Sequence, residues 1–456
     1  MSQSLQRRTI LCATLLGVYT LTNHASADDL RRRGMMGVQL APVTEETKTT
    51  LKLDSVKGVL VTGVVPDSAA AAAGAQPNDV IRKIGSDSID ELPSLFAAMR
   101  KYYGGDTLSM TLIREGAEKT LELTLKPRPT PSHSQFELVY DSAGEPGHRV
   151  RTFVAKPASE GKHPAVLIIT GIPGPQSIES PTPDAHPMIS LIYRLTQAGY
   201  VTMRVERPGV GDSEGVDLQA TTVAADVASF RAALAKLRSY DFVDENKVYV
   251  FSHSLGAALA PMVAADQKIA GIVTFAGFYR PWPAGLVDSM QRQWKLELVP
   301  DDERKTKETA LKGFLDQYLT KKEKPSDILA KTPDLAQMLG RGVIDRDFVV
   351  GMPAKYGQEL AEFNGPTAWS SVRVPVLAIW GESDYIADKS DSQQIVDSVN
   401  KSQPGKGKFI SMPETDHMMG KAVDQEESYL SGQGLMDPKF VETITKWMSE
   451  QPGQGS

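Results

Sequence analysis

The pattern of apolar and polar positions changes character near residue 136. Beyond that point, short and nearly continuous apolar runs alternate with stretches of helical periodicity. Such runs are typical of parallel strands whose two faces are both covered by helices. They predict strands at 164–170, 201–206, 247–251, 270–276 and 374–380. We therefore expect an α/β domain with a parallel sheet over residues 136–450.

The alternation of strands and helices breaks between residues 281 and 370. This stretch is polar, charged and helix-like, as in "WKLELVPDDERKTKETALKGFLDQYL" at 294–319. It predicts a helical lid, inserted over the carboxyl-terminal edge of the sheet.

Residues 34–128 have the pattern of a small, mostly β domain. Residues 107–112 and 120–125 alternate between polar and apolar side chains, with Glu115-Gly116 between them as a hairpin turn. One helical face is predicted by the spacing of four apolar residues, Leu92, Leu95, Phe96 and Met99. The Pro- and Ser-rich stretch "KPRPTPSHS" at 126–134 then predicts an interdomain linker, which we place at 129–135.

Composition narrows the function classes. The chain has 456 residues, of which 41% are hydrophobic, enough for two or three domains with sizeable cores. Its formal net charge is -6, and it holds no basic block of the kind that binds nucleic acid. We therefore expect no nucleic-acid partner.

The N-terminus has the three parts of a secretory signal peptide. Arg7 and Arg8 form a charged region, 9–22 is mostly apolar, and 25–27 is Ala-Ser-Ala. We expect a signal peptide at 1–27 and an exported protein, periplasmic or secreted; the alternative is a merely apolar N-terminus. The apolar run is short for a span of ~20 residues, so the mature protein should have no membrane span. The single cysteine, Cys12, would be removed with it.

The stretch "FSHSLGAAL" at 251–259 is a candidate catalytic motif, because it sets Ser254 on a corner between a strand end and a helix of small residues. A nucleophile elbow needs small residues two positions either side of its serine, here Ser252 and Gly256. The pattern is S-x-S-x-G, where G-x-S-x-G is the common form. The alternative is that serine is simply a small residue that tolerates a turn.

Two further residues follow strand ends and complete a catalytic set. Asp384 lies in "LAIWGESDYIAD" and His417 in "ISMPETDHMM". His417 is the expected base for Ser254, with Asp384 fixing its tautomer and stabilising the imidazolium. Asp388 and Asp391 are alternative acids.

The loop "IITGIPGPQ" after the strand at 164–170 is a candidate oxyanion site. Its glycine lets backbone N–H groups face a substrate oxygen, and Pro173 has no N–H. We therefore expect Ile172 to donate, together with the N–H of Leu255 at the helix start. A glycine-rich turn, "VERPGVGDSEG" at 205–215, follows the next strand.

Together, these motifs and their order resemble the α/β-hydrolase superfamily over roughly residues 136–450. The resemblance implies a carboxylesterase-like serine hydrolase with a Ser-Asp-His triad, cleaving an ester or related acyl bond through an acyl-serine. The expected substrate is a small-molecule ester or a peptide. A serine peptidase of the prolyl-peptidase or aminopeptidase type stays open, as does a non-catalytic adaptor.

The first domain resembles PDZ domains of the bacterial periplasmic type. The resemblance is carried by "MMGVQL" at 35–40 and "GVLVTGVVPDSAAAAAGAQPNDVIRKIGSDSI" at 58–89. It implies that the backbone around Met36, Gly37 and Val38 receives a peptide C-terminus as an added strand. The alternative is a groove that is empty or filled by the chain's own linker.

The remaining candidates have structural interpretations beside functional ones. We expect His253 to point away from the pocket, Asp416 to be solvated, and His186 to start a helix or line the pocket. Met418 and Met419 line the pocket or pack in the core. The histidines show no metal-ligand spacing, so we expect neither metal nor cofactor.

Overall fold

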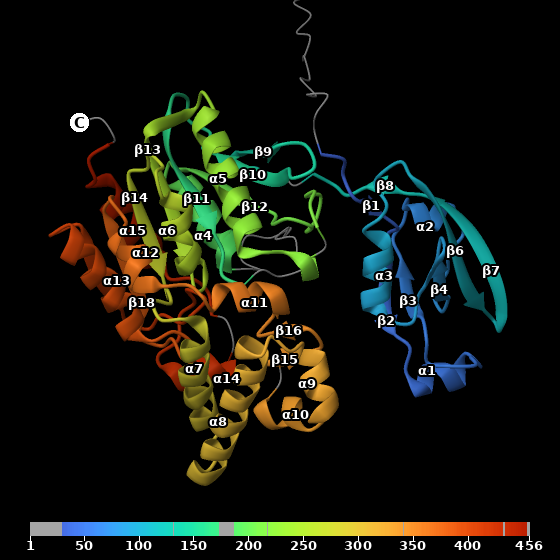
Figure 1. The fold of residues 1–456 in the computed structure, drawn as a ribbon. Coiled ribbons are helices and arrows are strands. Elements are labelled where there is room, and N and C mark those ends of the chain that lie inside the picture. The colour runs from blue at the N-terminus through green and yellow to red at the C-terminus, as the bar shows by residue number, and fades with distance from the viewer. Residues whose placement is uncertain are drawn as a thin grey trace, which may run out of the picture.

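The computed structural model describes residues 30–130, 132–172, 187–216, 218–340, 342–431 and 434–453. The predicted signal peptide at 1–27 and His186 lie outside the described residues. Figure 1 shows a small, mostly β domain beside a larger α/β domain.

The small domain contains a sheet in the order β2-β3-β4-β6-β7, with β5 paired to β4. The predicted hairpin is confirmed, because Glu115 (φ 51°) and Gly116 (φ 80°) form a two-residue turn between β6 and β7. The helix is also present, but its predicted apolar face is only partly buried: Leu95 lies in the core, whereas Phe96 is 55% exposed. The elements are β2 Val38–Pro42, α1 Glu45–Thr50, β3 Val59–Val64, α2 Ala69–Ala72, β4 Val80–Ile84, β5 Asp87–Ser88, α3 Leu92–Met99, β6 Thr107–Arg114 and β7 Ala117–Thr124.

The large domain is built on one sheet in the order β19-β18-β14-β13-β11-β12-β10-β9. Its strands are β9 Glu137–Ala143, β10 Val150–Lys156, β11 His163–Ile169, β12 Val201–Val205, β13 Val243–His253, β14 Gly271–Phe275, β18 Val376–Gly381 and β19 Gly407–Met412. The five predicted strands are confirmed as parallel neighbours. The pattern did not show that β9 and β10 pair antiparallel at the end of the sheet beyond β12.

Helices cover both faces of this sheet, so the parallel strands are buried as their apolar runs predict (Figure 1). α5 packs against α6, and α4 packs against α15. The helices are α4 Pro187–Gln197, α5 Val223–Ser239, α6 Gly256–Ala264, α13 Lys389–Ser402, α14 Gln425–Ser431 and α15 Pro438–Ser449, with a 3-10 turn, η2, at Leu218–Ala220. None of the helices in the described ranges is long and apolar enough to cross a bilayer.

A mainly helical insertion lies between β14 and β18, as predicted, and also holds three short strands. Its parts are α7 Trp282–Leu296, α8 Asp301–Leu315, the π-helix η3 Asp316–Thr320, α9 Pro325–Lys331, α10 Leu335–Leu339, β15 Ile344–Asp345, β16 Phe348–Val349, β17 Met352–Pro353, α11 Ala354–Leu360 and α12 Gly365–Ser370. In Figure 1 it forms the lower part of the large domain. The insertion thus covers one end of the sheet.

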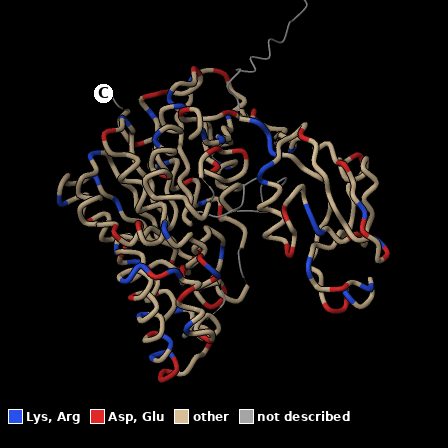
Figure 2. The backbone as a smooth tube through the Cα atoms, turned by 45° about the vertical axis from the view of Figure 1, so that its right-hand side comes forward, with Lys and Arg blue, Asp and Glu red and all other residues tan. Residues whose placement is uncertain are grey.

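Residues 30–35, which we call the N-terminal clasp, lie between the two domains. β1 (Gly34–Met35) pairs with β8 (Lys126–Pro127), so the start of the Pro-rich stretch is a strand of the small domain, ahead of the linker predicted at 129–135. Arg32 pairs with Asp212 of the large domain at 2.6 Å, and Arg151 donates to the carbonyl of Leu30 at 2.7 Å. The clasp contains the basic run 31–33; elsewhere, acidic and basic residues are interspersed over both domains (Figure 2).

Candidate active site

Ser254 lies on the corner where β13 passes into α6. Its φ is +55°, a left-handed backbone conformation that non-glycine residues rarely adopt and that is typical of strained functional turns. The corner brings α6 very close to β11: a Cβ on Gly256 would lie 2.7 Å from the carbonyl oxygen of Ile169. Only glycine fits there, which explains this part of the S-x-S-x-G pattern.

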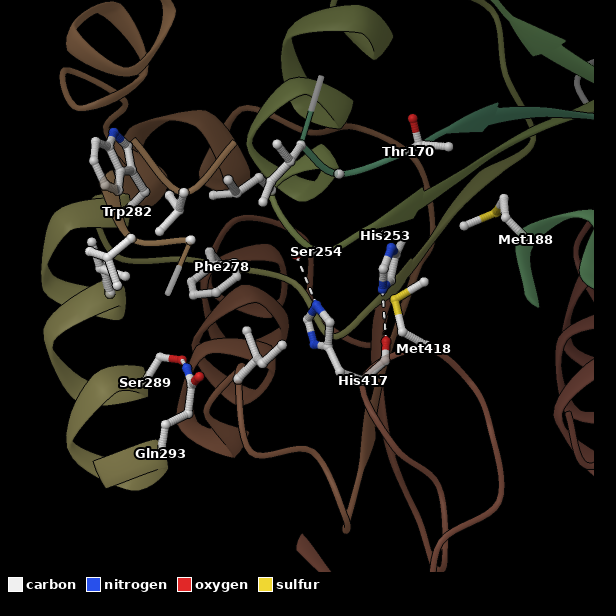
Figure 3. Close-up of a pocket in the computed structure, with 18 of the residues that line it drawn as sticks. Thr170, Met188, His253, Ser254, Phe278, Trp282, Ser289, Gln293, His417 and Met418 are labelled. Carbon is white, nitrogen blue, oxygen red and sulfur yellow. Dashed lines mark hydrogen bonds between the residues drawn. The ribbon is translucent and has the colours of Figure 1, made fainter. Parts of the chain in front are cut away.

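His417 and Asp384 meet Ser254 at the carboxyl-terminal edge of the sheet. His417 Nε2 lies 3.1 Å from Ser254 Oγ (Figure 3), and His417 Nδ1 lies 2.9 Å from Asp384 Oδ2. All three side chains are buried. The other oxygen of Asp384 accepts hydrogen bonds from the backbone N–H of Ile386 (2.7 Å) and Ala387 (2.9 Å). The carboxylate is therefore held in position on the side away from His417.

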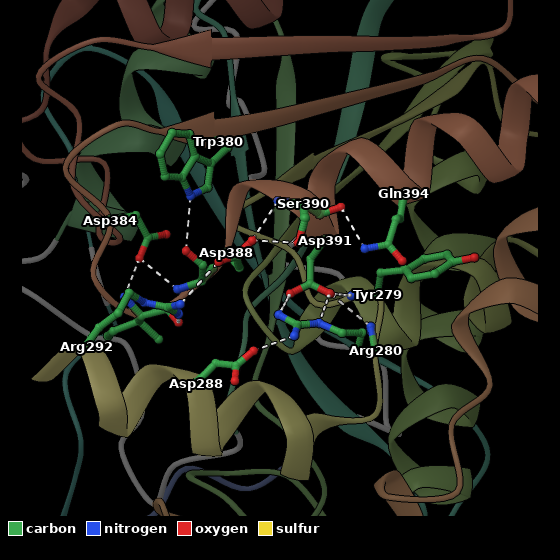
Figure 4. Close-up of polar contacts among 12 residues, drawn as sticks. Tyr279, Arg280, Asp288, Arg292, Trp380, Asp384, Asp388, Ser390, Asp391 and Gln394 are labelled. Carbon is green, nitrogen blue, oxygen red and sulfur yellow. Dashed lines mark hydrogen bonds and ion pairs between the residues drawn. The ribbon is translucent and has the colours of Figure 1, made fainter. Parts of the chain in front are cut away.

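The two alternative acids have other partners (Figure 4). Asp388 caps α13 by accepting from the N–H of Ser390 at 2.9 Å. Asp391 is fully buried and pairs with Arg280 at 2.9 Å. The geometry thus brings Asp384, and neither alternative, to His417.

An arginine of the insertion contacts the loop that carries Asp384. Arg292 of α7 donates from Nε to the carbonyl of Tyr385 at 2.9 Å, and its guanidinium also reaches the carbonyl of Ile386 and the side chain of Asp388. These contacts join residues more than 90 positions apart. No local pattern in the sequence signalled this role.

His253 and Asp416 differ from their expected surroundings. His253 lines the same cavity as Ser254, and its Nε2 lies 2.8 Å from the carbonyl oxygen of His417 (Figure 3). Asp416 is buried, and its Oδ1 accepts from the N–H groups of Met418 (2.8 Å) and Gly420 (2.6 Å). Burial raises the pKa of Asp416 above its usual value. The side chains of His253 and Asp416 thus point inward at the edge of the sheet, where each hydrogen-bonds to the loop that carries His417.

The expected oxyanion residues line the cavity beside Ser254. Gly171 lies against the serine: a Cβ there would be 3.0 Å from Ser254 Cβ. Ile172 and Leu255 both border the cavity; Ile172 is 43% exposed and Leu255 is buried. Pro173 lies outside the described residues. Met418 lines the cavity, whereas Met419 is buried in the core.

The cavity has a volume of about 750 Å³ and extends from Ser254 toward the insertion. On this side lies an apolar arm, formed by Phe278, Trp282, Leu286, Met290, Val343 and Ile386. Three polar residues also border this side of the cavity. Ser289 and Gln293 belong to α7, and Glu297 follows that helix at the exposed rim, where it accepts a hydrogen bond from Tyr429. Figure 3 shows Trp282, Phe278, Ser289 and Gln293 on this side of Ser254. Within the described ranges, no cluster of three or more His, Cys, Asp or Glu side chains could hold a metal ion.

The expected peptide site of the small domain is placed at a sheet edge. Gly37 has φ +79°, and a Cβ there would lie 2.2 Å from Ser68 Cβ, so the turn before β2 requires glycine. Met36 is buried, and Val38 begins β2. β2 pairs with β3, and the described strands leave its other edge unpaired, beside α3. This edge is open to an added strand.

A model of the alpha/beta hydrolase family matches residues 166–424, more than half of the chain. The chain belongs to this family. A PDZ domain model matches residues 34–125. The large domain is accordingly called the hydrolase domain, and the small one the PDZ domain.

The hydrolase and PDZ domains have separate relatives. Esterase EstD of Thermotoga maritima is 26% identical over 294 residues, which cover 64% of this chain and 63% of that protein. A probable periplasmic serine endoprotease, DegP-like, of Chlamydia trachomatis is 35% identical over 98 residues, 22% of this chain and 20% of that protein. The chain thus spans less than two thirds of the length of these relatives.

Solved structures are similar to this chain at lower sequence identity. Est1E from Butyrivibrio proteoclasticus is 15% identical, with a TM-score of 0.41 over 68% of this chain and 98% of that one.

Proposed function

We propose that the hydrolase domain cleaves an ester through an acyl-serine, with Ser254 as nucleophile, His417 as general base and Asp384 as the acid that orients it. The observation that carries the proposal is the unbroken hydrogen-bonded series from Asp384 through His417 to Ser254. His417 Nε2 accepts the hydroxyl proton as Oγ attacks the carbonyl carbon, and Asp384 stabilises the resulting imidazolium. The N–H groups of Ile172 and Leu255 are the proposed donors to the oxyanion.

The tetrahedral intermediate then collapses. The bond to the leaving alcohol breaks, His417 gives the proton to that alcohol, and the acyl group stays on Ser254 Oγ. Water attacks the acyl carbon with His417 again accepting a proton, and the carboxylic acid leaves as Oγ is protonated. Each group of the triad returns to its starting state.

The proposed substrate class is an ester with an apolar acyl or alkyl group. The apolar arm of the cavity supports this, because it offers side-chain surface but few hydrogen-bonding partners to such a group. The name of the EstD relative, an esterase, points the same way. The insertion supplies Trp282, Leu286 and Met290 from one face of α7, so it would act as the specificity-determining lid.

Two measurements test the function. A labelled fluorophosphonate should react with the wild-type protein and be found by mass spectrometry on the peptide that contains Ser254. p-Nitrophenyl esters of increasing chain length should be hydrolysed, with kcat/KM rising as the acyl group fills the apolar arm. A folded protein that does neither is the non-catalytic adaptor.

A peptidase is the second candidate, and one observation favours it. Glu297 places a carboxylate at the rim of the cavity, where it could bind the amino group of a peptide. Aminoacyl-p-nitroanilides distinguish the two, since only a peptidase should hydrolyse them at rates near those of the esters. Glu297→Gln should then weaken the nitroanilide and leave the esters unchanged.

The PDZ domain is proposed to dock a peptide as a strand beside β2, with the C-terminus of the peptide at the backbone around Met36, Gly37 and Val38. The unpaired strand edge supports this, as does the exposed Phe96 on the neighbouring helix. Glu91, at the start of that helix, pairs with Arg346 of the insertion at 2.6 Å, so a docked peptide would lie near the lid. Selection from a library of C-terminal peptides, followed by titration of one that binds, tests the site.

Export is proposed as well, with cleavage after Ala27. The tripartite N-terminal sequence supports it, and so does the periplasmic description of the DegP-like relative. Mass spectrometry of the mature protein should find Asp28 as the first residue. An intact Met1 on protein from the cytosol would contradict it.

A further inference from the structure

Arg207 lies in the glycine-rich turn that follows β12, and its side chain is buried. It belongs to a hydrogen-bonded network that has no role in the acyl-transfer steps proposed above. Its guanidinium reaches three separate parts of the hydrolase domain: the loop after β11, helix α5 and the insertion. Such a position is costly for a cation unless each donor has a partner.

One nitrogen of Arg207 holds the loop of the proposed oxyanion site. Nη2 lies 2.6 Å from the carbonyl oxygen of Thr170 and 2.7 Å from that of Gly171. The carbonyl of Gly171 and the N–H of Ile172 belong to the same peptide unit, which is planar and trans. The two groups therefore point in opposite directions. Because the carbonyl is held toward Arg207, the N–H of Ile172 is directed away from it.

The other nitrogen of Arg207 is anchored by a buried carboxylate and a tyrosine. Nη1 lies 2.6 Å from Asp226 of α5, and the hydroxyl of Tyr356 in α11 donates to the same carboxylate oxygen at 2.8 Å. Burial raises the pKa of Tyr356 well above its usual value, so the hydroxyl keeps its proton and donates it. The network therefore runs from the insertion to the loop beside Ser254.

We propose that Arg207, anchored by Asp226 and Tyr356, is a positioning residue that orients the N–H of Ile172 toward the transition state and makes the oxyanion site depend on the insertion. The proposal rests on the proposed function and adds a specific role for three residues outside the triad, of which Arg207 borders the cavity. The contribution of Arg207 is realised only when the oxyanion forms. Loss of the network should therefore lower kcat and leave ester binding nearly unchanged.

The test uses two variants of the full chain. Arg207→Met alone would leave Asp226 buried without its cation, so the first variant is the double change Arg207→Met with Asp226→Leu, which removes both charges. Its kcat for a p-nitrophenyl ester should fall about 10- to 100-fold, below the loss seen when an oxyanion donor is removed outright. The second variant, Tyr356→Phe, removes one hydroxyl and should lower kcat about three- to ten-fold, with KM within about two-fold.

Tyr318→Phe is the matched control. Tyr318 is also a buried tyrosine of the insertion, and its hydroxyl donates to the carbonyl of Ala354 at the start of α11 rather than to Asp226. Its loss should change thermal stability about as much as Tyr356→Phe and leave kcat unchanged. An alkyl trifluoromethyl ketone, which forms a tetrahedral adduct with the serine, supplies a second readout. Its inhibition constant should rise in proportion to the loss of kcat/KM in the network variants alone.

The outcomes separate failure of the positioning role of Arg207 from failure of the proposed function. If the network variants fold and keep wild-type kcat and ketone affinity, Arg207 does not position the oxyanion site. The same holds if Tyr318→Phe loses as much kcat as Tyr356→Phe, or if KM rises while kcat is kept. Should the double variant not fold, Tyr356→Phe against Tyr318→Phe decides. A wild-type protein that turns over no ester and resists the fluorophosphonate overturns the proposed function and, with it, this role.

Discussion

The PDZ and hydrolase domains differ most in what they bury. Among the residues described before 130, the buried polar side chains are Ser68 and Asp79, and each has a local structural partner. Ser68 caps α2, and Asp79 pairs with Arg114 at 2.7 Å. Among the described residues, the hydrolase domain instead buries 27 polar and charged side chains, and these include the triad and its neighbours His253 and Asp416.

This difference follows from how each domain would work. Strand addition at the edge of β2 uses backbone N–H and C=O groups, which any sheet edge already has. Acyl transfer needs side chains held in fixed orientation in a dry site, and each must be satisfied by hydrogen bonds when the site is empty. Buried polar networks therefore distinguish the domain proposed to carry out the chemistry from the domain proposed to bind a peptide. The predictions below test this division, from the largest expected effect to the smallest.

Ser254→Ala should give the largest effect on activity. Without the hydroxyl there is no acyl-serine, so kcat for a p-nitrophenyl ester should fall by about 10⁴-fold or more. The strained corner keeps its backbone, because alanine differs from serine only by the hydroxyl. Circular dichroism and the melting temperature should therefore match the wild type. A folded variant with most of its activity would show that another residue is the nucleophile.

Asp384→Asn should lower kcat by roughly 10³- to 10⁴-fold, because asparagine neither holds the correct tautomer of His417 nor stabilises its charged form. Asp388→Asn is the matched control, since asparagine also caps helices and Asp388 is not bonded to His417. Its kcat should stay within about three-fold of the wild type. If Asp388→Asn is the more damaging change in steady-state kinetics, the acid has been assigned to the wrong residue.

Much of the fold, and the grouping of this site, could be predicted from the sequence for one physical reason. Parallel strands end at one edge of their sheet, so residues that follow apolar runs, such as Ser254 and Asp384, are brought together there. The contacts of Arg207 and Arg292 could not be predicted, because each joins segments far apart along the chain. The inward orientation of His253 is likewise set by the loop of His417, 164 residues later.

The N-terminal clasp was not predicted, because its contacts also join segments far apart along the chain. It bears on the comparison because residues outside the hydrolase domain here contact buried charged groups of that domain, Asp212 and Arg151. Arg32→Met should lower the free energy of unfolding by about 2 kcal/mol, since Arg32 donates to the buried Asp212. Arg31 pairs with Asp106 of the PDZ domain, but its side chain is 59% exposed. Arg31→Met should cost under about 1 kcal/mol. Urea unfolding of both variants checks the difference; equal losses would contradict a specific role for Arg32.

Excision of the PDZ domain should have the smallest effect on chemistry, provided that residues 30–33 of the clasp stay. The N–H of Arg128 donates to the carbonyl of Arg33 at 2.9 Å across the β1–β8 pair. This is the bond that closes a two-residue hairpin turn, so Asn-Gly can replace residues 34–127 without moving either end. The longer deletion of 30–128 is the control, and it should lower the melting temperature because Arg151 and Asp212 lose partners.

The excised protein should hydrolyse a small ester with kcat/KM within about three-fold of the full chain, because no residue of the triad or of the oxyanion loop belongs to the PDZ domain. The ion pair that joins the PDZ domain to the lid, Arg346 with Glu91, is exposed, and exposed pairs contribute little to stability. If the excised protein folds, by circular dichroism and melting, but has lost small-ester turnover, the division between the domains is wrong. The PDZ domain would then hold the insertion in its active arrangement, and recognition and chemistry would be one function of the whole chain.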